Sequence, residues 1–226
     1  MQTEQKIQNA ARNIITFTDS YTQGKQGKQN EQPESKSKPS LTAIASSLKY
    51  IKYQIQNNNT SKSVIQIPNL LKSLTTLVTF RLDTHLREEI DRQILEVRHQ
   101  SRECLRFIQV YGDEQVQTEL VNNEYGRVIS FSYSTSGGKG EERDYEIYNG
   151  LDFILQFLRD LHEGRNYQPS FQPLPLLARR TEEQIEEEGA LEEIDAQMIN
   201  KGKNGDIKIW TNEAKVMQLN RFIYRH

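Results

Sequence analysis

The last quarter of the chain carries the pattern that most restricts what the chain can fold into. Residues 181–224 read as a short acidic helix, a corner at Gly189, a second helix, a turn of glycine and asparagine, and a third helix. Three helices of this size form one unit of a helical solenoid, and such a unit cannot bury its apolar side alone. Stability therefore requires stacking on similar units. Stacked units leave long lateral surfaces, which favours protein binding over catalysis.

Apolar residues at the 3.6-residue spacing of a helix recur through the rest of the chain as well. The expected helices are 4–18, 41–56 with Ser40 as its N-cap, one that starts at Pro68 and Asn69, 84–111 ended by Gly112, 113–123 capped by Asp113, and 145–161. We expect a polar loop between residues 57 and 68, and a turn at Tyr125-Gly126. These patterns predict an all-α fold.

Residues 127–136 allow two interpretations. Their alternation of apolar and hydroxyl side chains favours a strand on propensity alone. A single strand among helices would have no pairing partner, and tertiary context commonly overrides propensity. We therefore predict a helix here, with a strand as the alternative.

Residues 20–40 combine glycine, glutamine, lysine, serine and two prolines with almost no apolar side chain. Such a segment buries too little apolar surface to offset the entropy lost on ordering, so it is predicted to be a disordered linker. Its lysines could form a localisation or nucleic-acid patch, but they are spaced apart and diluted by Glu31 and Glu34. A solvated linker is the better interpretation.

Charge and cysteine content narrow the class of protein. Lysine and arginine number 29 against 31 aspartates and glutamates, so no strong net charge would attract nucleic acid. Cys104 is the only cysteine, which excludes an internal disulfide and fits a reducing compartment, the cytoplasm by preference and the nucleus as the alternative. Its position in a helical pattern indicates a small buried residue. The longest apolar stretch, 67–82, is interrupted by Lys72, so no direct insertion into a membrane is expected.

No pattern of catalytic or metal-binding residues stands out. The histidines are scattered, at His85, His99, His162 and His226. The acidic run 182–188 lacks the spacing of a calcium loop and is interpreted as a solvated helix face. Residues 136–142 lack the second glycine and the Lys-Ser/Thr pair of a phosphate loop. We predict no catalytic residues, no cofactor and no metal. A hydrolase with unrecognised residues is kept as a distant enzymatic hypothesis.

The segment 163–178 interleaves three prolines with leucines and a phenylalanine, which predicts an extended conformation. Its apolar side chains either pack on the helices or form an exposed ligand for another protein, and packing is favoured because isolated leucines are unfavourable in water. Phe171, Leu174 and Leu176 are accordingly candidate partner-binding residues.

When the predicted helices are aligned along the chain, their order repeats. Residues 113–161 and 181–225 each read as a short helix, a glycine, a second helix and a long third helix, and 68–111 reads as the last two helices of a preceding unit. With Glu188-Gly189-Ala190-Leu191 and the Leu219-Asn220 pair, this order resembles armadillo-type repeats. In nuclear-import adaptors of that family, a Trp and an Asn four residues apart hold a peptide. The resemblance therefore suggests Asn220 and Val216, which stands at the Trp position, as partner-binding residues.

A second, narrower resemblance rests on residues 104–109 and 151–157, the latter followed by a Gly-Arg-Asn-Tyr-Gln segment. These stretches look like the armadillo-like cytosolic helical region of the inositol trisphosphate and ryanodine receptor calcium-release channels. Gly112-Asp113 departs from the Asn and His of those channels, and pore helices are lacking. The resemblance implies at most a regulatory relative or fragment of that region.

Together these observations predict an all-α, short armadillo/HEAT-like solenoid. The expected organisation is an N-terminal helix in 1–19, a disordered linker in 20–40 and a helical repeat domain in 41–226. The predicted function is that of a non-enzymatic scaffold or adaptor that binds protein partners in a larger complex. Because the open end of a solenoid exposes apolar surface unless it is capped, the chain is also expected either to form homo-oligomers through its open ends or to be poorly soluble.

Overall fold

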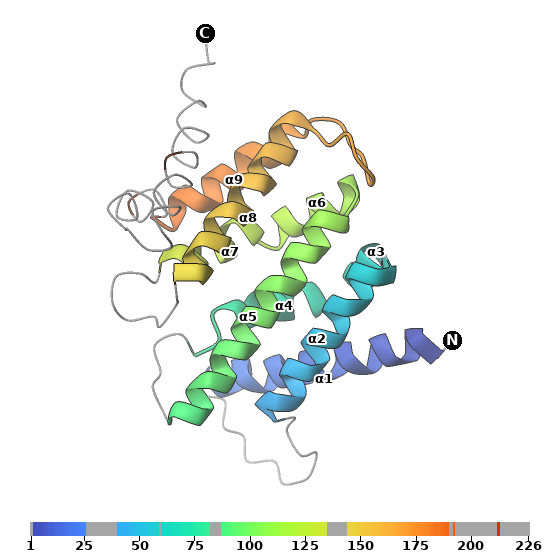
Figure 1. Ribbon diagram of the computed structural model, residues 1–226, viewed down its shortest axis with the longest axis vertical. Coiled ribbons are helices and arrows are strands. Elements are labelled where there is room, and N and C mark those ends of the chain that lie inside the picture. Colours follow the sequence, from blue (N-terminus) through green and yellow to red (C-terminus); the bar gives the residue numbers. More distant parts are fainter. Residues whose placement is uncertain are drawn as a thin grey trace. The chain divides into compact units, whose positions relative to one another are not determined.

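The computed structural model describes residues 2–25, 40–58, 60–81, 87–134 and 144–189, together with the single residues 192 and 212. The chain divides into two compact units, Met1–Gly112 and Asp113–His226. In the described part of each unit every regular element is a helix (Figure 1), and the backbone pairing of Arg165 with Phe171 is an isolated bridge. The all-α class predicted from the sequence is confirmed.

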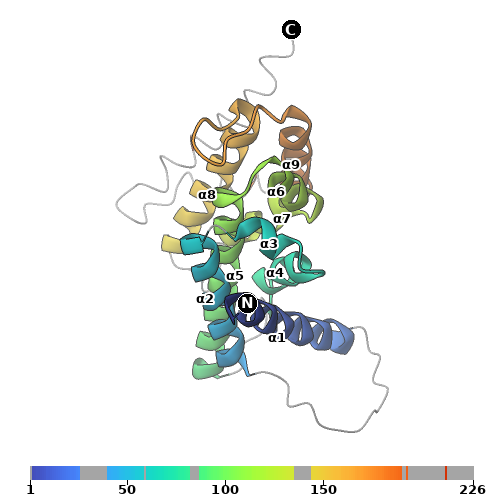
Figure 2. The same cartoon turned by 90° about the vertical axis from the view of Figure 1, so that its right-hand side faces the viewer.

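The first unit is built on the long helix α5. Its described helices are α1 Gln2–Lys25, α2 Leu41–Asn58, α3 Ser61–Ile65, α4 Leu70–Val78 and α5 Glu88–Tyr111. α5 packs against α2 and α4, and Figure 2 shows α1 beside the same two helices. The core holds side chains with no exposed surface, among them Ile14, Ile44, Leu48, Leu74, Val97 and Ile108.

Helix α1 continues beyond the predicted end of the N-terminal helix. It runs to Lys25, so residues 20–25 are helical and the linker prediction is wrong for them. The reason is a long-range aromatic contact. Tyr21 packs edge-on against Phe80 with ring centroids 4.7 Å apart, and Phe17 meets the same ring at 5.3 Å. Aromatic pairs of this geometry stabilise by about 0.5–1.5 kcal/mol beyond their buried area.

Local capping signals mark several helix ends as predicted. The Ser40 hydroxyl accepts a hydrogen bond from the Ala43 amide at 3.2 Å, which confirms it as the N-cap of α2. Gly112 leaves the helical conformation with φ −87° and ψ 143° and ends α5. The predicted polar loop before Pro68 is wrong in part, because it contains α3. Val64 in that helix is 1% exposed, and its burial accounts for the extra turn.

The second unit contains four described helices, and three of them pack around α9. The four helices are α6 Glu114–Asn122, α7 Tyr125–Ser134, α8 Asp144–Glu163 and α9 Pro175–Glu187. α9 contacts α6, α7 and α8, and α7 also packs against α8. The Asp113 carboxylate accepts a hydrogen bond from the Val116 amide at 3.2 Å, so the predicted cap of α6 is confirmed. The helix predicted for 127–136 is confirmed for 127–134; residues 135 and 136 lie outside the described residues.

The turn between α6 and α7 falls two residues earlier than predicted. It consists of Asn123 and Glu124, with Glu124 at φ 60°, and Gly126 is already part of α7. A Cβ atom on Gly126 would lie 2.9 Å from Thr181 Cγ2 and 3.1 Å from the Thr181 carbonyl oxygen. This glycine therefore serves the close crossing of α7 and α9 and not the turn.

The predicted repeat is described only in its first copy. α6, α7 and α8 have the expected order of a short helix, a second helix and a long third helix. In the second copy the first helix begins at Pro175 instead of residue 181, because proline fits the first turn of a helix. Gly189 forms the expected corner at φ 67°. Most of 190–226 and all of 26–39 lie outside the described residues, so the solenoid and the remaining linker stay predictions.

Candidate functional site

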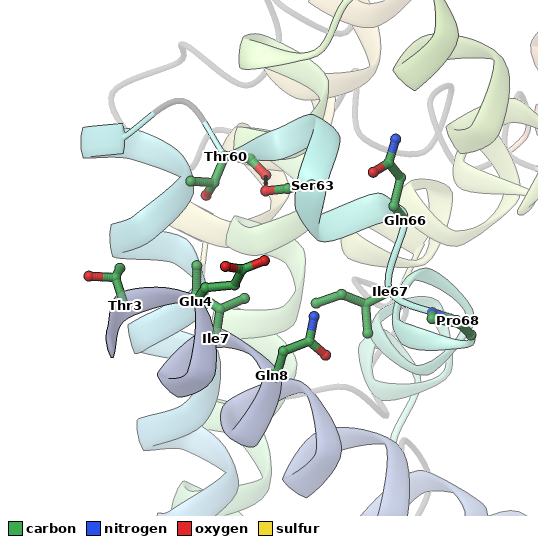
Figure 3. A pocket seen from close by; sticks show the side chains of 9 residues that line it. All are labelled: Thr3, Glu4, Ile7, Gln8, Thr60, Ser63, Gln66, Ile67 and Pro68. Carbon is green, nitrogen blue, oxygen red and sulfur yellow. Dashed lines mark hydrogen bonds between the residues drawn. The ribbon is translucent and has the colours of Figure 1, made fainter. Parts of the chain in front are cut away.

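A groove of about 450 Å³ lies in the first unit between the start of α1, the start of α3 and the turn that leads to α4 (Figure 3). The two walls share neighbours: α1 packs on α2 and α4, and α3 contacts α2, α4 and α5. The groove lies between the first turns of α1 and α3. Ile7 and Ile67, each 7% exposed, form the apolar part of its lining together with Pro68.

The remaining lining of this groove is polar. Glu4, in the first turn of α1, is the one residue with a formal charge among the nine that line it. Figure 3 shows its carboxylate on the α1 side and the Thr60 and Ser63 side chains on the α3 side. The Ser63 hydroxyl donates to the Thr60 carbonyl oxygen at 2.9 Å. Thr60 Oγ1 is buried, and the described part of the chain offers it no hydrogen-bond partner. These groups equip the groove for recognising a ligand by hydrogen bonds and charge.

A second, more apolar groove of about 310 Å³ lies between α2 and α5. Leu41 and Ala45 line it, and Lys49 Nζ lies 2.7 Å from Glu96 Oε1 at its edge. Burial alone would raise the pKa of Glu96, but the hydrogen bond and the charge of Lys49 outweigh it and lower the pKa below its ordinary value. Because both partners are more than a third exposed, this ion pair contributes little to stability.

The three described residues that were predicted to bind a partner differ in their surroundings. Phe171 is 7% exposed and packs within the second unit, Leu174 is half-buried, and Leu176 is 82% exposed in the first turn of α9. Residues 164–174 form no helix, but they bend at 167–169 so that Arg165 pairs with Phe171. The extended conformation predicted for 163–178 is wrong at Glu163, which ends α8, and from Pro175, where α9 begins. Val216 and Asn220 lie outside the described residues.

Arg165, which the sequence patterns did not reveal, holds the segment between α8 and α9. Its side chain has no exposed surface and lies 3.5 Å from the Asp160 carboxylate. Its Nε donates to the Pro169 carbonyl oxygen at 2.8 Å, and its guanidinium lies over the Phe171 ring, 4.5 Å from the centroid. Two backbone hydrogen bonds of 2.8 and 3.1 Å join Arg165 and Phe171.

Gly164 is the first residue of the same segment and lies close to its far end. It has φ 76°, and a Cβ atom there would lie 2.7 Å from the Phe171 carbonyl oxygen, so only glycine fits without rearrangement. Residues 164–174 are thus fixed from within by a buried cation and by close backbone contacts. We call residues 164–177 the α8–α9 segment.

The acidic run 182–188 is not a uniformly solvated face, and that prediction is wrong for Glu182. The Glu182 side chain is 4% exposed and accepts a hydrogen bond across 2.8 Å from His162 Nε2 of α8 when that nitrogen is protonated. This hydrogen bond raises the pKa of His162 above its ordinary value, against the smaller effect of burial. Residues 181, 182 and 185 lie on the packed face of α9, so Glu182 is turned inward.

Cys104 behaves as an ordinary structural residue. Cys104 is fully buried, its thiol donates to the Leu48 carbonyl oxygen at 3.2 Å, and burial raises its pKa to about 12. The buried small residue predicted from the sequence is confirmed. His85 and His226 lie outside the described residues. Within the described ranges, no group of three histidine, cysteine, aspartate or glutamate side chains could hold a metal ion. None of the helices described is both long and apolar enough to cross a bilayer.

Comparison with known proteins identifies no relative. No protein-family model matches the chain, and no curated protein or solved structure resembles it significantly. The resemblances to armadillo repeats and to calcium-release channels therefore stay predictions from the sequence.

Proposed function

We propose that this protein is a non-enzymatic adaptor that binds another protein through the α8–α9 segment. The observation that carries the proposal is Leu176, a large apolar side chain that is 82% exposed at the end of a segment held in place by Arg165. Armadillo-like stacking of the helices is part of the proposal, supported by the helix order in 113–161.

Exposed large apolar side chains are rare among the described residues. Tyr53, Tyr167 and Leu176 are the three, and two of them belong to the α8–α9 segment. A single exposed leucine is common on protein surfaces. Leu176 differs from such a residue because it closely follows residues 164–174, which the buried Arg165 holds in place.

Rigidity matters because association is opposed by the entropy of ordering a surface. Each side chain or loop that must be immobilised costs free energy, and a surface that is already ordered avoids part of that cost. Burying the exposed area of one leucine contributes about 1.5–3 kcal/mol, which corresponds to roughly 10-fold to 150-fold in affinity. Leu176 therefore has the properties of an anchor residue that inserts into an apolar pocket of a partner.

The test compares two matched substitutions. Leu176→Gln and Tyr53→Gln each replace an exposed apolar side chain at a helical position with a good helix former. The full-length chain would be tagged in its native cells, and the co-purified proteins would be quantified for the wild type and both variants. We expect at least one protein that is retained by the wild type and by Tyr53→Gln and lost by Leu176→Gln. An unchanged set of proteins with Leu176→Gln would contradict the proposal.

A further inference from the structure

We propose that the groove between α1 and α3 binds a lysine side chain of a partner protein. This site lies in the first unit and is independent of the α8–α9 segment, which belongs to the second unit. The groove combines an apolar floor, one carboxylate and an unsatisfied hydroxyl, which are the features that an ammonium group on an aliphatic stem requires.

Charge decides the sign of the ligand. Glu4 is the single formal charge in the lining, so an ammonium group gains an ion pair there. Glu4 is exposed, and the first turn of a helix favours a negative charge, so the carboxylate needs no rearrangement to face a ligand.

The apolar floor selects an aliphatic stem. Ile7 and Ile67 lie below the rim, and Pro68 adds a third apolar surface. Lysine places its four methylene groups along apolar surface while its ammonium group stays beside polar partners. The volume of about 450 Å³ is larger than one side chain, which leaves room for part of the peptide backbone beside the rim amides of Gln8 and Gln66.

Thr60 supplies an independent reason to expect a ligand. Its hydroxyl oxygen is buried and has no hydrogen-bond partner in the described ranges, and buried hydroxyl groups without a partner destabilise a protein. It also makes no capping hydrogen bond to α3, so rotation of the side chain breaks no hydrogen bond of the hydroxyl. Rotation about χ1 toward the groove would let the hydroxyl oxygen accept a hydrogen bond from the ammonium group, which has three donors.

The experiment is a titration of the isotope-labelled full chain with Nα-acetyl-lysine N-methylamide, followed by NMR. The matched probes are the norleucine analogue, which lacks the ammonium group, and the Nε-acetyl derivative, which lacks the charge. We expect shifts of the backbone amides of residues 4–8 and 60–68, and binding at least about threefold tighter for lysine than for either probe. Equal binding of the three probes, or shifts only outside these residues, overturns the proposal.

Protein variants separate recognition from folding. Glu4→Gln should weaken binding of the lysine probe about threefold, whereas Glu114→Gln, which removes an exposed carboxylate from the first turn of α6, should leave it unchanged. Thr60→Val should weaken binding about threefold and at the same time raise the melting temperature of the ligand-free protein, because it removes an unpaired buried hydroxyl. A melting temperature that rises without any change in binding contradicts the role of Thr60.

The source of the ammonium group is tested in the same titration. If 1,5-diaminopentane binds more tightly than the capped lysine, the groove recognises a free amine and the proposed protein partner is wrong. Because Leu176→Gln leaves this groove intact, loss of the adaptor activity in that variant and loss of lysine binding in Glu4→Gln are separate results.

Discussion

Replacing Arg165 by methionine should loosen the α8–α9 segment. Methionine keeps most of the aliphatic stem but removes the charge beside Asp160, the hydrogen bond from Nε to the Pro169 carbonyl oxygen and the contact of the guanidinium with the Phe171 ring. The Asp160 carboxylate, 10% exposed, then loses its nearby cation.

The expected loss of stability in Arg165→Met follows from the burial of the Arg165–Asp160 ion pair. Removing one partner of a buried ion pair typically destabilises by about 3–5 kcal/mol, since the remaining charge stays buried. The 3.5 Å separation of Arg165 and Asp160 is long for a strong pair, so we expect about 3 kcal/mol. The double variant Arg165→Met/Asp160→Asn should be less destabilised than the sum of the two single variants, because it leaves no isolated charge.

Hydrogen exchange measured by mass spectrometry reports the effect locally. The amides of Arg165 and Phe171 hydrogen-bond to each other's carbonyl oxygens, and a peptide that covers 164–174 should exchange about 100-fold faster in Arg165→Met if the opening free energy falls by about 3 kcal/mol. Peptides of α2 and α5 serve as internal controls. Unchanged exchange in 164–174 would refute the reasoning that Arg165 holds this segment.

Two further predictions concern helix contacts of the second unit. The hydrogen bond to Glu182 raises the pKa of His162 in the folded protein, so the contribution of His162 to stability is fully present below the ordinary pKa of about 6.5 and is lost as the pH rises through the higher folded value. His162→Gln should therefore flatten the decline of the melting temperature measured from pH 6 upward. An unaltered slope would contradict this role of His162. Gly126→Ala should destabilise the protein by about 1–3 kcal/mol in urea unfolding, because the added Cβ atom would meet α9. The control Gly24→Ala, at a helical position where the Cβ atom meets nothing within 4 Å, should stabilise it by up to about 1 kcal/mol. A stabilised Gly126→Ala would show that α7 and α9 do not cross closely.

The helices were predictable because their signals are local. Apolar spacing placed α2, α5 and α8, and the caps Ser40 and Asp113 follow from side chains that bond to amides three residues away. The helical state of 127–134 was also predictable once a single strand was judged to lack a partner.

The end of α1 and the burial of Glu182 were not predictable, because long-range contacts decide them. Tyr21 is helical through its packing on Phe80, some 60 residues away in the sequence. The Glu182 carboxylate meets His162 of another helix. The periodicity of apolar residues within one segment does not predict which distant residue will pack on that segment.

The candidate sites were only partly visible in the sequence. The proline and leucine content of the α8–α9 segment drew attention to Leu176, but it did not separate this exposed residue from the buried Phe171. Arg165 belongs to no recognisable sequence motif, although the preceding glycine, Gly164, is a local signal for a backbone with positive φ. The groove lined by Glu4 and Thr60 has no sequence signature, since it lies between two helices that are far apart in the sequence.

The most direct test of the adaptor function is the affinity of a purified partner for the full chain, measured by titration calorimetry. For a protein retained in the purification described above, the account predicts that Leu176→Gln weakens binding by about tenfold or more and makes the heat-capacity change of binding less negative, while Tyr53→Gln binds like the wild type. A dissociation constant of Leu176→Gln within about twofold of the wild type, a difference of less than about 0.5 kcal/mol, would contradict the account.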